Sequence, residues 1–208
     1  MKLAIRNVLT VVVISGVMGC ATIAPSQNNE LEVPPQLAGK VTILGPSDPD
    51  YPRAGFYKAK NEMGKGGISN GLVIKTKEDV TVYRLWNGPL KVDDYGNTNR
   101  FGAWWSYEPP AGKADTYRKN YGVCTSWNDL SWVAKCTLKT GSVVAIGPGQ
   151  SVSVKMCNNK ERPESYSANP AVWQMYIDTP LYRRDELKCP KYKESDYEAY
   201  EDDISRRK

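Results

Sequence analysis

The N-terminal residues constrain this chain most, because they decide in which compartment it folds. Two basic side chains, Lys2 and Arg6, precede an uncharged run from Val8 to Val17. A basic start followed by a short apolar run is typical of a secretory signal peptide. The run is about ten residues long, whereas a membrane-spanning helix needs about 20. We therefore expect residues 1–19 to be a cleaved signal and the rest of the chain to fold outside the cytoplasm.

The end of this segment carries a more specific pattern. Val17, Met18 and Gly19 precede Cys20, and this sequence resembles the lipobox of bacterial lipoproteins. The resemblance implies cleavage before Cys20 and attachment to the membrane through a lipid (palmitate) on that residue. Ala21 follows the cysteine, where an Asp would resemble an inner-membrane retention signal, so we expect the outer membrane, facing the periplasm or the surface. A chance cysteine after an ordinary signal is the alternative.

Four further cysteines, Cys124, Cys136, Cys157 and Cys189, follow Cys20. An even number in an oxidising compartment predicts two disulfide bonds. Of the three connectivities we favour Cys124–Cys136, which would join neighbouring segments, and Cys157–Cys189, which would tie the C-terminal part to the domain. Zinc is the alternative, but no pair has the C-x-x-C spacing that is common in zinc sites, and we expect no metal.

The chain contains no histidine. This excludes a Ser-His-Asp triad, a Cys-His pair and His-ligated zinc, so any catalysis must use Glu, Asp, Gln, Arg, Tyr, Ser or Lys. Without Lys2 and Arg6 the formal charge falls from +5 to +3. No basic cluster accompanies this mild charge, and we expect no nucleic-acid partner.

Composition divides the mature chain into three parts. Residues 20–39 are rich in Pro, Gln, Asn and Glu and predict a flexible tether. Residues 40–190 are long enough for a single globular domain, with loops up to about residue 70. Residues 191–208 predict a charged tail that is solvated or weakly helical.

β-Branched and aromatic runs predict strands in the second half of this domain. These runs are residues 72–74, 80–83, 103–107, 132–138, 142–146, 151–156 and 171–177. We expect a hairpin or tight connection at Gly147-Pro148-Gly149 and a short helix within 111–123. The predicted class is a β-rich α+β fold stapled by two disulfides.

Three segments of these predicted strands carry side chains suited to a ligand. Arg84 lies in the middle of one strand, Gln174 in the middle of a later one, and residues 100–106 with their two tryptophans lie between them. A charge in mid-strand is costly unless it is paired or points into a cleft. A guanidinium with indole faces, a hydroxyl and an amide suits an anionic ligand that carries a planar ring.

At these residues the sequence resembles the ADP-ribosyltransferase superfamily, in particular its NAD-glycohydrolase toxin domains. The matching positions are Arg84, the segment 102–106 and Gln174, within residues 80–177. The resemblance implies a mixed β-sandwich of the ADP-ribosyltransferase type. It also implies that NAD is a substrate and that no cofactor is tightly bound.

The resemblance gives each of these residues a role. Arg84 would hold the pyrophosphate or the nicotinamide ribose, and Ser106 would support the strand under the nicotinamide. Trp104 or Trp105 would stack nearby, and Gln174 would orient the ribose while the glycosidic bond breaks. Members that modify proteins usually carry a Glu at the last motif. The Gln here favours NAD hydrolysis over ADP-ribosyl transfer, and leaves a loss of activity open.

Other interpretations remain open for the same residues. Arg84 would form a salt bridge with Glu78, Asp79 or another acid at the edge of a sheet, the tryptophans would build the core, and Gln174 would face solvent. The chain would then be a non-catalytic envelope lipoprotein with an envelope protein partner, such as an accessory of a secretion apparatus, a surface-exclusion protein or an inhibitor. Carbohydrate binding through exposed aromatic residues is a third function without a motif.

Overall fold

The computed structural model of this chain describes residues 31–207. The signal peptide expected at 1–19, the lipidation expected at Cys20 and most of the tether expected at 20–39 lie outside the described residues. The last part of that tether lies inside them: Pro35–Leu37 form a 3-10 helix, η1, and the Leu37 side chain is buried in the core. Among residues 31–207, none of the helices has the length and apolarity needed to span a bilayer.

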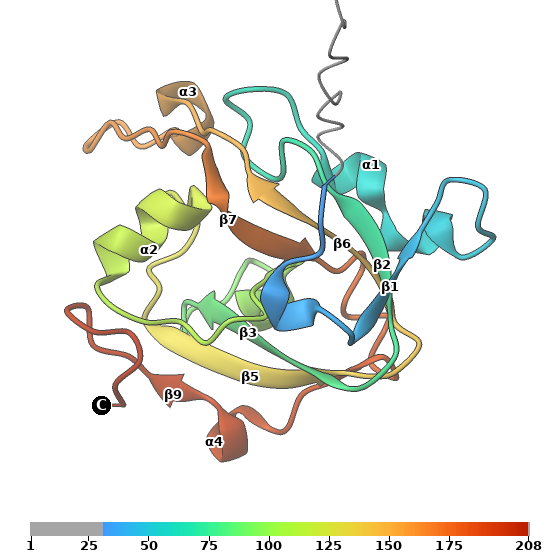
Figure 1. The fold of residues 1–208 in the computed structure, drawn as a ribbon. Coiled ribbons are helices and arrows are strands. Elements are labelled where there is room, and N and C mark those ends of the chain that lie inside the picture. The colour runs from blue at the N-terminus through green and yellow to red at the C-terminus, as the bar shows by residue number, and fades with distance from the viewer. Residues whose placement is uncertain (1–30, 208) are drawn as a thin grey trace, which may run out of the picture. The chain divides into compact units, whose positions relative to one another are not determined.

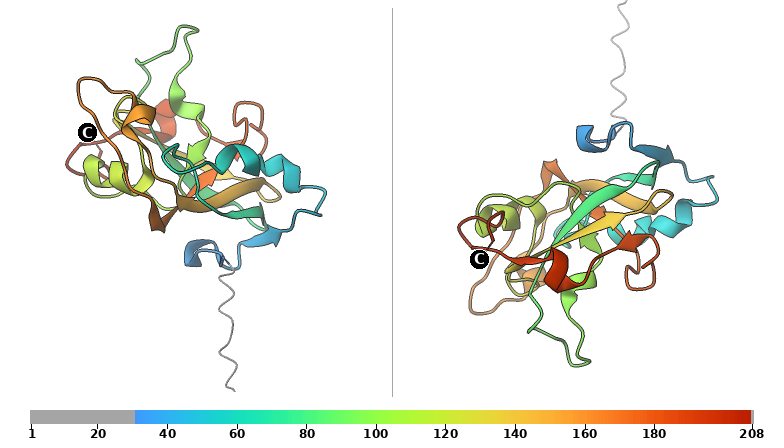
Figure 2. Two further views of the ribbon diagram at one scale, coloured as in Figure 1. Left: turned by 90° about the horizontal axis from the view of Figure 1, so that it is seen from above. Right: turned by 90° about the horizontal axis from the view of Figure 1, so that it is seen from below.

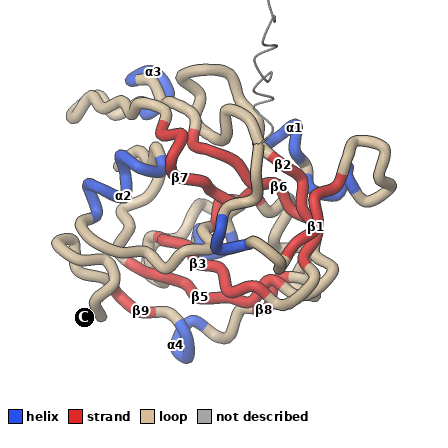
Figure 3. The backbone as a smooth tube through the Cα atoms, in the orientation of Figure 1, coloured by secondary structure: helices blue, strands red, loops and turns tan. Residues whose placement is uncertain are grey.

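Two antiparallel sheets make up the fold (Figure 3). The larger sheet has the order β1-β2-β6-β7-β4, with strands Val41–Leu44, Leu72–Thr76, Val143–Gly149, Asn169–Tyr176 and Trp104–Trp105. The smaller sheet has the order β3-β5-β8, with β9 also paired to β5, and its strands are Val80–Trp86, Trp132–Leu138, Leu187–Lys188 and Tyr197–Glu198. The β-rich α+β class is therefore confirmed. Every pair of these strands is antiparallel, so the expected mixed β-sandwich is corrected to two antiparallel sheets.

The main core lies between the two sheets. Ile74, Ile146 and Met175 come from the larger sheet and pack in one cluster with Val82 and Leu138 from the smaller sheet. Each fully buried side chain of this kind contributes about 1.5–3 kcal/mol. Packing of the two inner faces therefore provides most of the stabilisation, and it fixes the β3 and β7 backbones that carry Arg84 and Gln174.

The strand β4 joins the two sheets, although it is very short. Trp104 and Trp105 pair with Tyr176 and Met175 of β7. The next residue, Ser106, exchanges both backbone hydrogen bonds with Tyr83 of β3, at 2.7 and 2.8 Å. Three segments that are far apart in the sequence, β3, β4 and β7, are therefore consecutive in space.

The segment Gly147-Pro148-Gly149 continues β6 and makes no hairpin, contrary to expectation. A Cβ on Gly147 would lie 2.1 Å from the carbonyl oxygen of Asn70, so this close approach requires glycine. The pairing of β6 with β7 becomes irregular between Pro148 and Gly149, and a strand tolerates proline at such an irregularity. The glycines therefore serve a close approach of two backbones and not a turn.

The strand expected at 151–156 is also wrong, because Val154–Cys157 form the helix α3. The Ser153 side chain accepts a hydrogen bond from the Met156 amide and caps this helix. A serine N-cap satisfies one of the otherwise unpaired amides at the start of a helix. That local gain outweighs the weak strand preference of this segment.

The remaining helices are short and lie at the edges of the sheets. They are η2 (Tyr51–Ala54), α1 (Phe56–Ala59), η3 (Asn99–Phe101), α2 (Ala114–Tyr121) and α4 (Tyr192–Ser195). The helix α2 confirms the expectation for 111–123, ends at Gly122 with φ 61°, and packs beside β7 (Figure 1). The loop of residues 87–98 projects from the body (Figure 2).

The C-terminal segment is part of the fold. We expected a solvated tail from residue 191, but β9 pairs with β5, and Ala199 and Ile204 are buried. These two side chains pack with Leu85 and Val133 of the smaller sheet. Two apolar residues spaced within a charged sequence were too weak a signal to predict this packing.

Two disulfide bonds are present, as expected, but their connectivity differs from the one we favoured. Cys124 is bonded to Cys157 and Cys136 to Cys189. Cys136 lies in β5, whose neighbour Thr137 pairs with Lys188 of β8, so the sheet places Cys189 beside it. The connectivity that we favoured rested on proximity in the sequence. The pairing of strands β5 and β8 decides instead which cysteines meet.

Candidate functional site

A cavity of about 140 Å³ lies where β3, β4, β7 and α2 meet. It is lined by Arg84 of β3, Trp104 and Trp105 of β4, and Gln174 of β7. All four were candidate site residues on sequence grounds. Their positions span 90 residues of the chain, from 84 to 174, and the fold brings them to one cavity.

The Arg84 guanidinium has no acidic partner. Its Nε donates to the Asn99 carbonyl at 3.0 Å and its Nη1 to the Trp104 carbonyl at 2.7 Å. Among the described residues, no carboxylate lies within salt-bridge distance of it: Glu78 pairs with Lys40 and Asp79 with Lys139. The alternative in which Arg84 forms an ion pair with Glu78 or Asp79 is therefore wrong.

The Arg84 side chain is partly buried. Desolvation lowers its pKa to about 10. The side chain is still protonated at neutral pH. It therefore keeps a full positive charge, and its hydrogen-bond acceptors among the described residues are neutral carbonyl oxygens.

Gln174 is buried, contrary to the interpretation that it faces solvent, with 6% of its surface exposed. Its Nε2 donates to the Gly67 carbonyl at 2.7 Å. This bond fixes the orientation of the amide. Within the described part of the chain no donor is found for Oε1, so this oxygen is available as an acceptor toward the cavity.

Ser106 lies behind the cavity wall and does not line it. Its Oγ donates to the Glu108 carbonyl at 2.8 Å and lies 3.3 Å from the Tyr121 hydroxyl. The residue is 2% exposed. Ser106 therefore holds β4 against β3 and positions Tyr121, which matches a supporting role better than contact with a ligand.

The two tryptophans differ in how they are held. Trp105 is buried and its indole N–H donates to the Gly102 carbonyl at 2.8 Å. Trp104 is half-buried and packs edge-to-face on Tyr176, with ring centroids 5.0 Å apart. Trp104 is therefore the more accessible of the two to a ligand, whereas Trp105 belongs to the core cluster as well.

Sequence reasoning missed three aromatic residues of the cavity, namely Tyr117, Tyr121 and Trp127. Tyr117 and Tyr121 stack on each other with ring centroids 4.3 Å apart. Their spacing of four residues in a predicted helix was the available signal, because such residues share one helix face. Burial raises the pKa of both hydroxyls, so they stay neutral at physiological pH.

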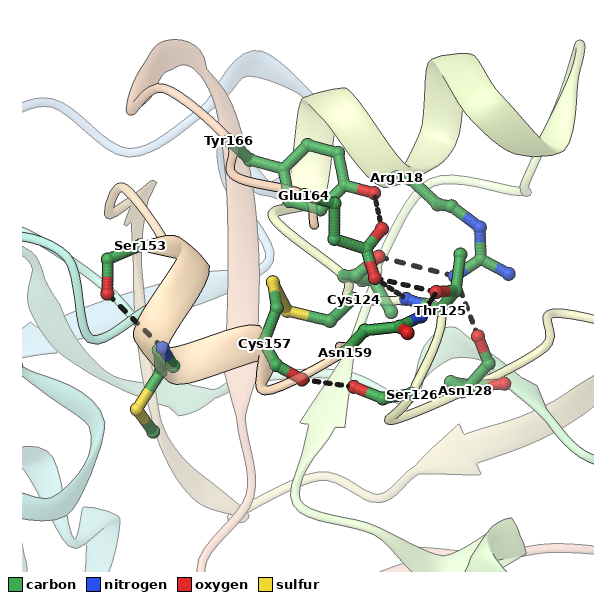
Figure 4. Close-up of a disulfide and its surroundings, with 12 residues drawn as sticks. Arg118, Cys124, Thr125, Ser126, Asn128, Ser153, Cys157, Asn159, Glu164 and Tyr166 are labelled. Carbon is green, nitrogen blue, oxygen red and sulfur yellow. Dashed lines mark hydrogen bonds between the residues drawn. A yellow bond between two sulfur atoms is a disulfide. The ribbon is translucent and has the colours of Figure 1, made fainter. Parts of the chain in front are cut away.

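The loop after α2 closes one side of the cavity, and Figure 4 shows how it is fixed. The Cys124–Cys157 disulfide ties it to α3, and the Arg118 guanidinium donates to the carbonyls of Val123 and Asn128. At its end Leu130 has φ 61°, an uncommon value for a side chain of this size. Conformations of this kind persist only where the surroundings enforce them, so this wall is held rigidly.

The turn that receives Arg84 is fixed from the other side. A Cβ on Gly102 would lie 2.1 Å from the Arg84 guanidinium, so the guanidinium rests on bare backbone. In the same turn, Arg100 makes a bidentate ion pair with Asp196, at 2.7 and 2.8 Å, and donates to the Pro190 carbonyl. The C-terminal segment therefore supports the turn whose Asn99 carbonyl orients Arg84.

No family model, no curated protein and no solved structure matches this chain. The geometry of the cavity is therefore what bears on function. It offers one cation, five aromatic side chains and the amide oxygens of Gln174 and Asn128, of which the Asn128 oxygen already accepts from the Leu130 amide, and none of its lining residues is acidic. Such a site can bind a planar ring and stabilise a neighbouring negative charge.

Proposed function

We propose that this chain is a lipid-tethered envelope protein whose folded domain binds a dinucleotide of the NAD class and cleaves its nicotinamide–ribose bond. The observation that carries the proposal is the convergence of Arg84, Trp104 and Gln174 on one cavity. These are the positions at which the sequence resembles the ADP-ribosyltransferase superfamily. Positions chosen at random on three strands that are far apart in the sequence would not be expected to line one cavity.

The order of the three segments in space also supports a fold of the ADP-ribosyltransferase type. The strand with the arginine, the short aromatic strand with its serine and the strand with the glutamine are consecutive neighbours. The second segment holds the other two together. The three motifs can form one site only if the segments that carry them are neighbours in space.

The size of the cavity limits what enters it. A volume of about 140 Å³ is well below the roughly 300 Å³ of the smallest drug-sized sites. One aromatic ring with its carboxamide fills it, and the ribose and phosphates would lie at its mouth. Arg84 supplies the positive charge for the anionic part, and the aromatic side chains supply the faces for the ring.

Gln174 has the geometry for the bond-breaking step. Its Oε1 accepts no bond from the described residues, and the Gly67 carbonyl holds the amide in place. A fixed amide oxygen orients a ribose hydroxyl and favours the positive charge that develops on the ribose. Since no carboxylate lines the cavity to activate a protein acceptor, water is the acceptor in this proposal.

The tether and the disulfides support an envelope location. Two disulfides in a chain of this size favour an oxidising compartment, in agreement with the lipobox-like sequence at Cys20. We expect Cys20→Ser to abolish uptake of labelled palmitate and to release the protein from membranes. Membrane association of this variant, together with an unlabelled wild type, would contradict the lipid tether.

The catalytic proposal is tested by release of nicotinamide from NAD, measured by chromatography with the purified full-length chain in detergent. We expect Gln174→Ala to lower the turnover rate more than the affinity, because its interaction strengthens as the ribose becomes positive. Gln36→Ala, at an exposed position outside the cavity, is the matched control. Turnover that is unchanged in Gln174→Ala would remove the residue from the mechanism.

A second candidate is a non-catalytic binding lipoprotein. The observation that favours it is the lack of an acid or base with an accessible pKa among the cavity residues, since the two tyrosines are held neutral. This candidate predicts binding of NAD or of a ring fragment with no release of nicotinamide. The same assay therefore separates the two functions.

A further inference from the structure

The charge of the cavity is not balanced. Arg84 is the one lining residue that carries a charge at neutral pH, and the described residues place no Asp or Glu in the wall. Its hydrogen-bond partners, the Asn99 and Trp104 carbonyls, are neutral. Arg100, one turn away, shows the contrast, because its charge is neutralised by a buried carboxylate at 2.7 Å.

An occupant of so small a cavity must lie close to this charge. Arg84 lines the same space of about 140 Å³ as Gln174 and the aromatic residues, so a ring that fills the space contacts all of them. Coulomb interactions are several times stronger in such a poorly solvated site than in water. The faces of the aromatic rings attract cations, but a full charge acts over a longer range than a ring quadrupole.

We propose that this cavity selects its ring by charge: an aromatic carboxylate binds most tightly, a neutral carboxamide less tightly, and a pyridinium cation least. The inference rests on the proposed site and names the ligand class that it prefers. It also identifies aromatic carboxylates as inhibitors that compete with a dinucleotide for the cavity.

The selection has a consequence for the cleavage step. The nicotinamide ring of NAD is a cation, and Arg84 disfavours it in the cavity. When the bond between ribose C1′ and the ring nitrogen breaks, its electron pair passes to the nitrogen and the ring becomes neutral. C1′ becomes an oxocarbenium centre, takes the oxygen of a water molecule, and one proton leaves to solvent. Cleavage thereby relieves the repulsion between the ring and Arg84.

The test is calorimetric binding of three rings of nearly equal size to the full-length chain in detergent: nicotinate, nicotinamide and the pyridinium cation 1-methylnicotinamide. The wild type is expected to bind them in that order, with about a tenfold loss of affinity at each step. Arg84→Met is expected to bring the three affinities within about threefold of one another. Arg162→Met, at an exposed position, should retain the wild-type order.

The wild-type order alone decides the inference, even if Arg84→Met fails to fold. Equal affinities, a cation that binds most tightly, or no binding of any ring would overturn it. Release of nicotinamide from NAD by a protein that binds the three rings equally would leave the proposed function standing without this inference. Ordered binding without any release would leave the inference and remove the enzymatic function.

Discussion

Two arginines meet at the turn of residues 99–102, the buried Arg100 and the partly buried Arg84, and they are held in opposite ways. Arg100 meets the carboxylate of Asp196, whose side chain has no exposed surface, in a bidentate pair. Arg84 meets only the carbonyl oxygens of Asn99 and Trp104. The first arginine is fully neutralised by the fold, whereas the second keeps its charge beside a cavity.

The difference separates a structural cation from a functional one. A buried charge is tolerated when it is paired, and the pair is strongly destabilising when one partner is removed. Burying a charge without a charged partner costs stability. The region around Arg100 holds the C-terminal segment and the turn in place, and we propose that Arg84, which this turn orients, presents its charge to a ligand.

The largest effect should follow from breaking the Arg100 pair. We expect Asp196→Ala to lower the free energy of unfolding by about 3–5 kcal/mol, because Arg100 would be left buried and unpaired. Asp185→Ala, which removes the solvent-exposed partner of Lys188, should cost under about 1 kcal/mol. Chemical denaturation measures both. Equal losses for the two variants would show that the buried pair contributes no more to the free energy of unfolding than the exposed pair does.

The two disulfides extend the comparison, since Cys124–Cys157 fixes the cavity wall and Cys136–Cys189 fixes the support of Arg100. Replacing either pair with serines should lower the free energy of unfolding by about 2–4 kcal/mol. Only the loss of Cys124–Cys157 should also weaken ring binding directly, because the loop of residues 123–130 would become mobile. Thermal unfolding and calorimetry check the two effects. A larger loss of affinity in the Cys136–Cys189 variant would reverse the assignment.

In Arg84→Met we expect a larger effect on ligand binding than on the free energy of unfolding, the opposite of Asp196→Ala. Loss of the charge-assisted contact should weaken binding of an anionic ligand by about 1.5–3 kcal/mol. The free energy of unfolding should change by less than in Asp196→Ala, because removal of the Arg84 charge leaves no oppositely charged side chain without its partner. A fold as destabilised as that of Asp196→Ala, with unchanged affinity, would show that Arg84 is structural.

The smallest effect concerns alkaline pH. Burial lowers the pKa of Arg84 to about 10, so the folded chain releases this proton at a lower pH than the unfolded chain. Between about pH 10 and 12.5 the unfolded chain holds more protons at this group, and the group's contribution to stability rises with pH there. Affinity for nicotinate should be constant from pH 6 to 9 and fall above about pH 10. Nicotinamide affinity should show no such fall, and parallel curves for both rings would contradict the role of the charge.

The sequence predicted the parts of the site that depend on local pattern. Arg84 was recognisable because a charge in mid-strand is costly unless it is paired or points into a cleft, and Gln174 because its strand resembles the last motif of the ADP-ribosyltransferase superfamily. The strands were predictable from their β-branched residues. The convergence of these strands depends on the pairing of β4 with β7 and of Ser106 with Tyr83, which no local pattern encodes.

The failures have the same cause. The disulfide partners of Cys124 and Cys136 are set by contacts between distant segments, and so is the burial of Ile204 beneath an otherwise charged C-terminal sequence. Gly147 looked like a turn residue, but it is required by the approach of the Asn70 backbone. Each of these features is a long-range contact that a single sequence does not reveal.

The most direct test of the account is a calorimetric titration of the full-length chain in detergent with NAD at millimolar concentration. The account predicts heat of binding for the wild type and for Arg162→Met. A flat titration of the wild type, with the fold intact by circular dichroism, would contradict it. The cavity around Arg84 and Gln174 would then not be a dinucleotide site.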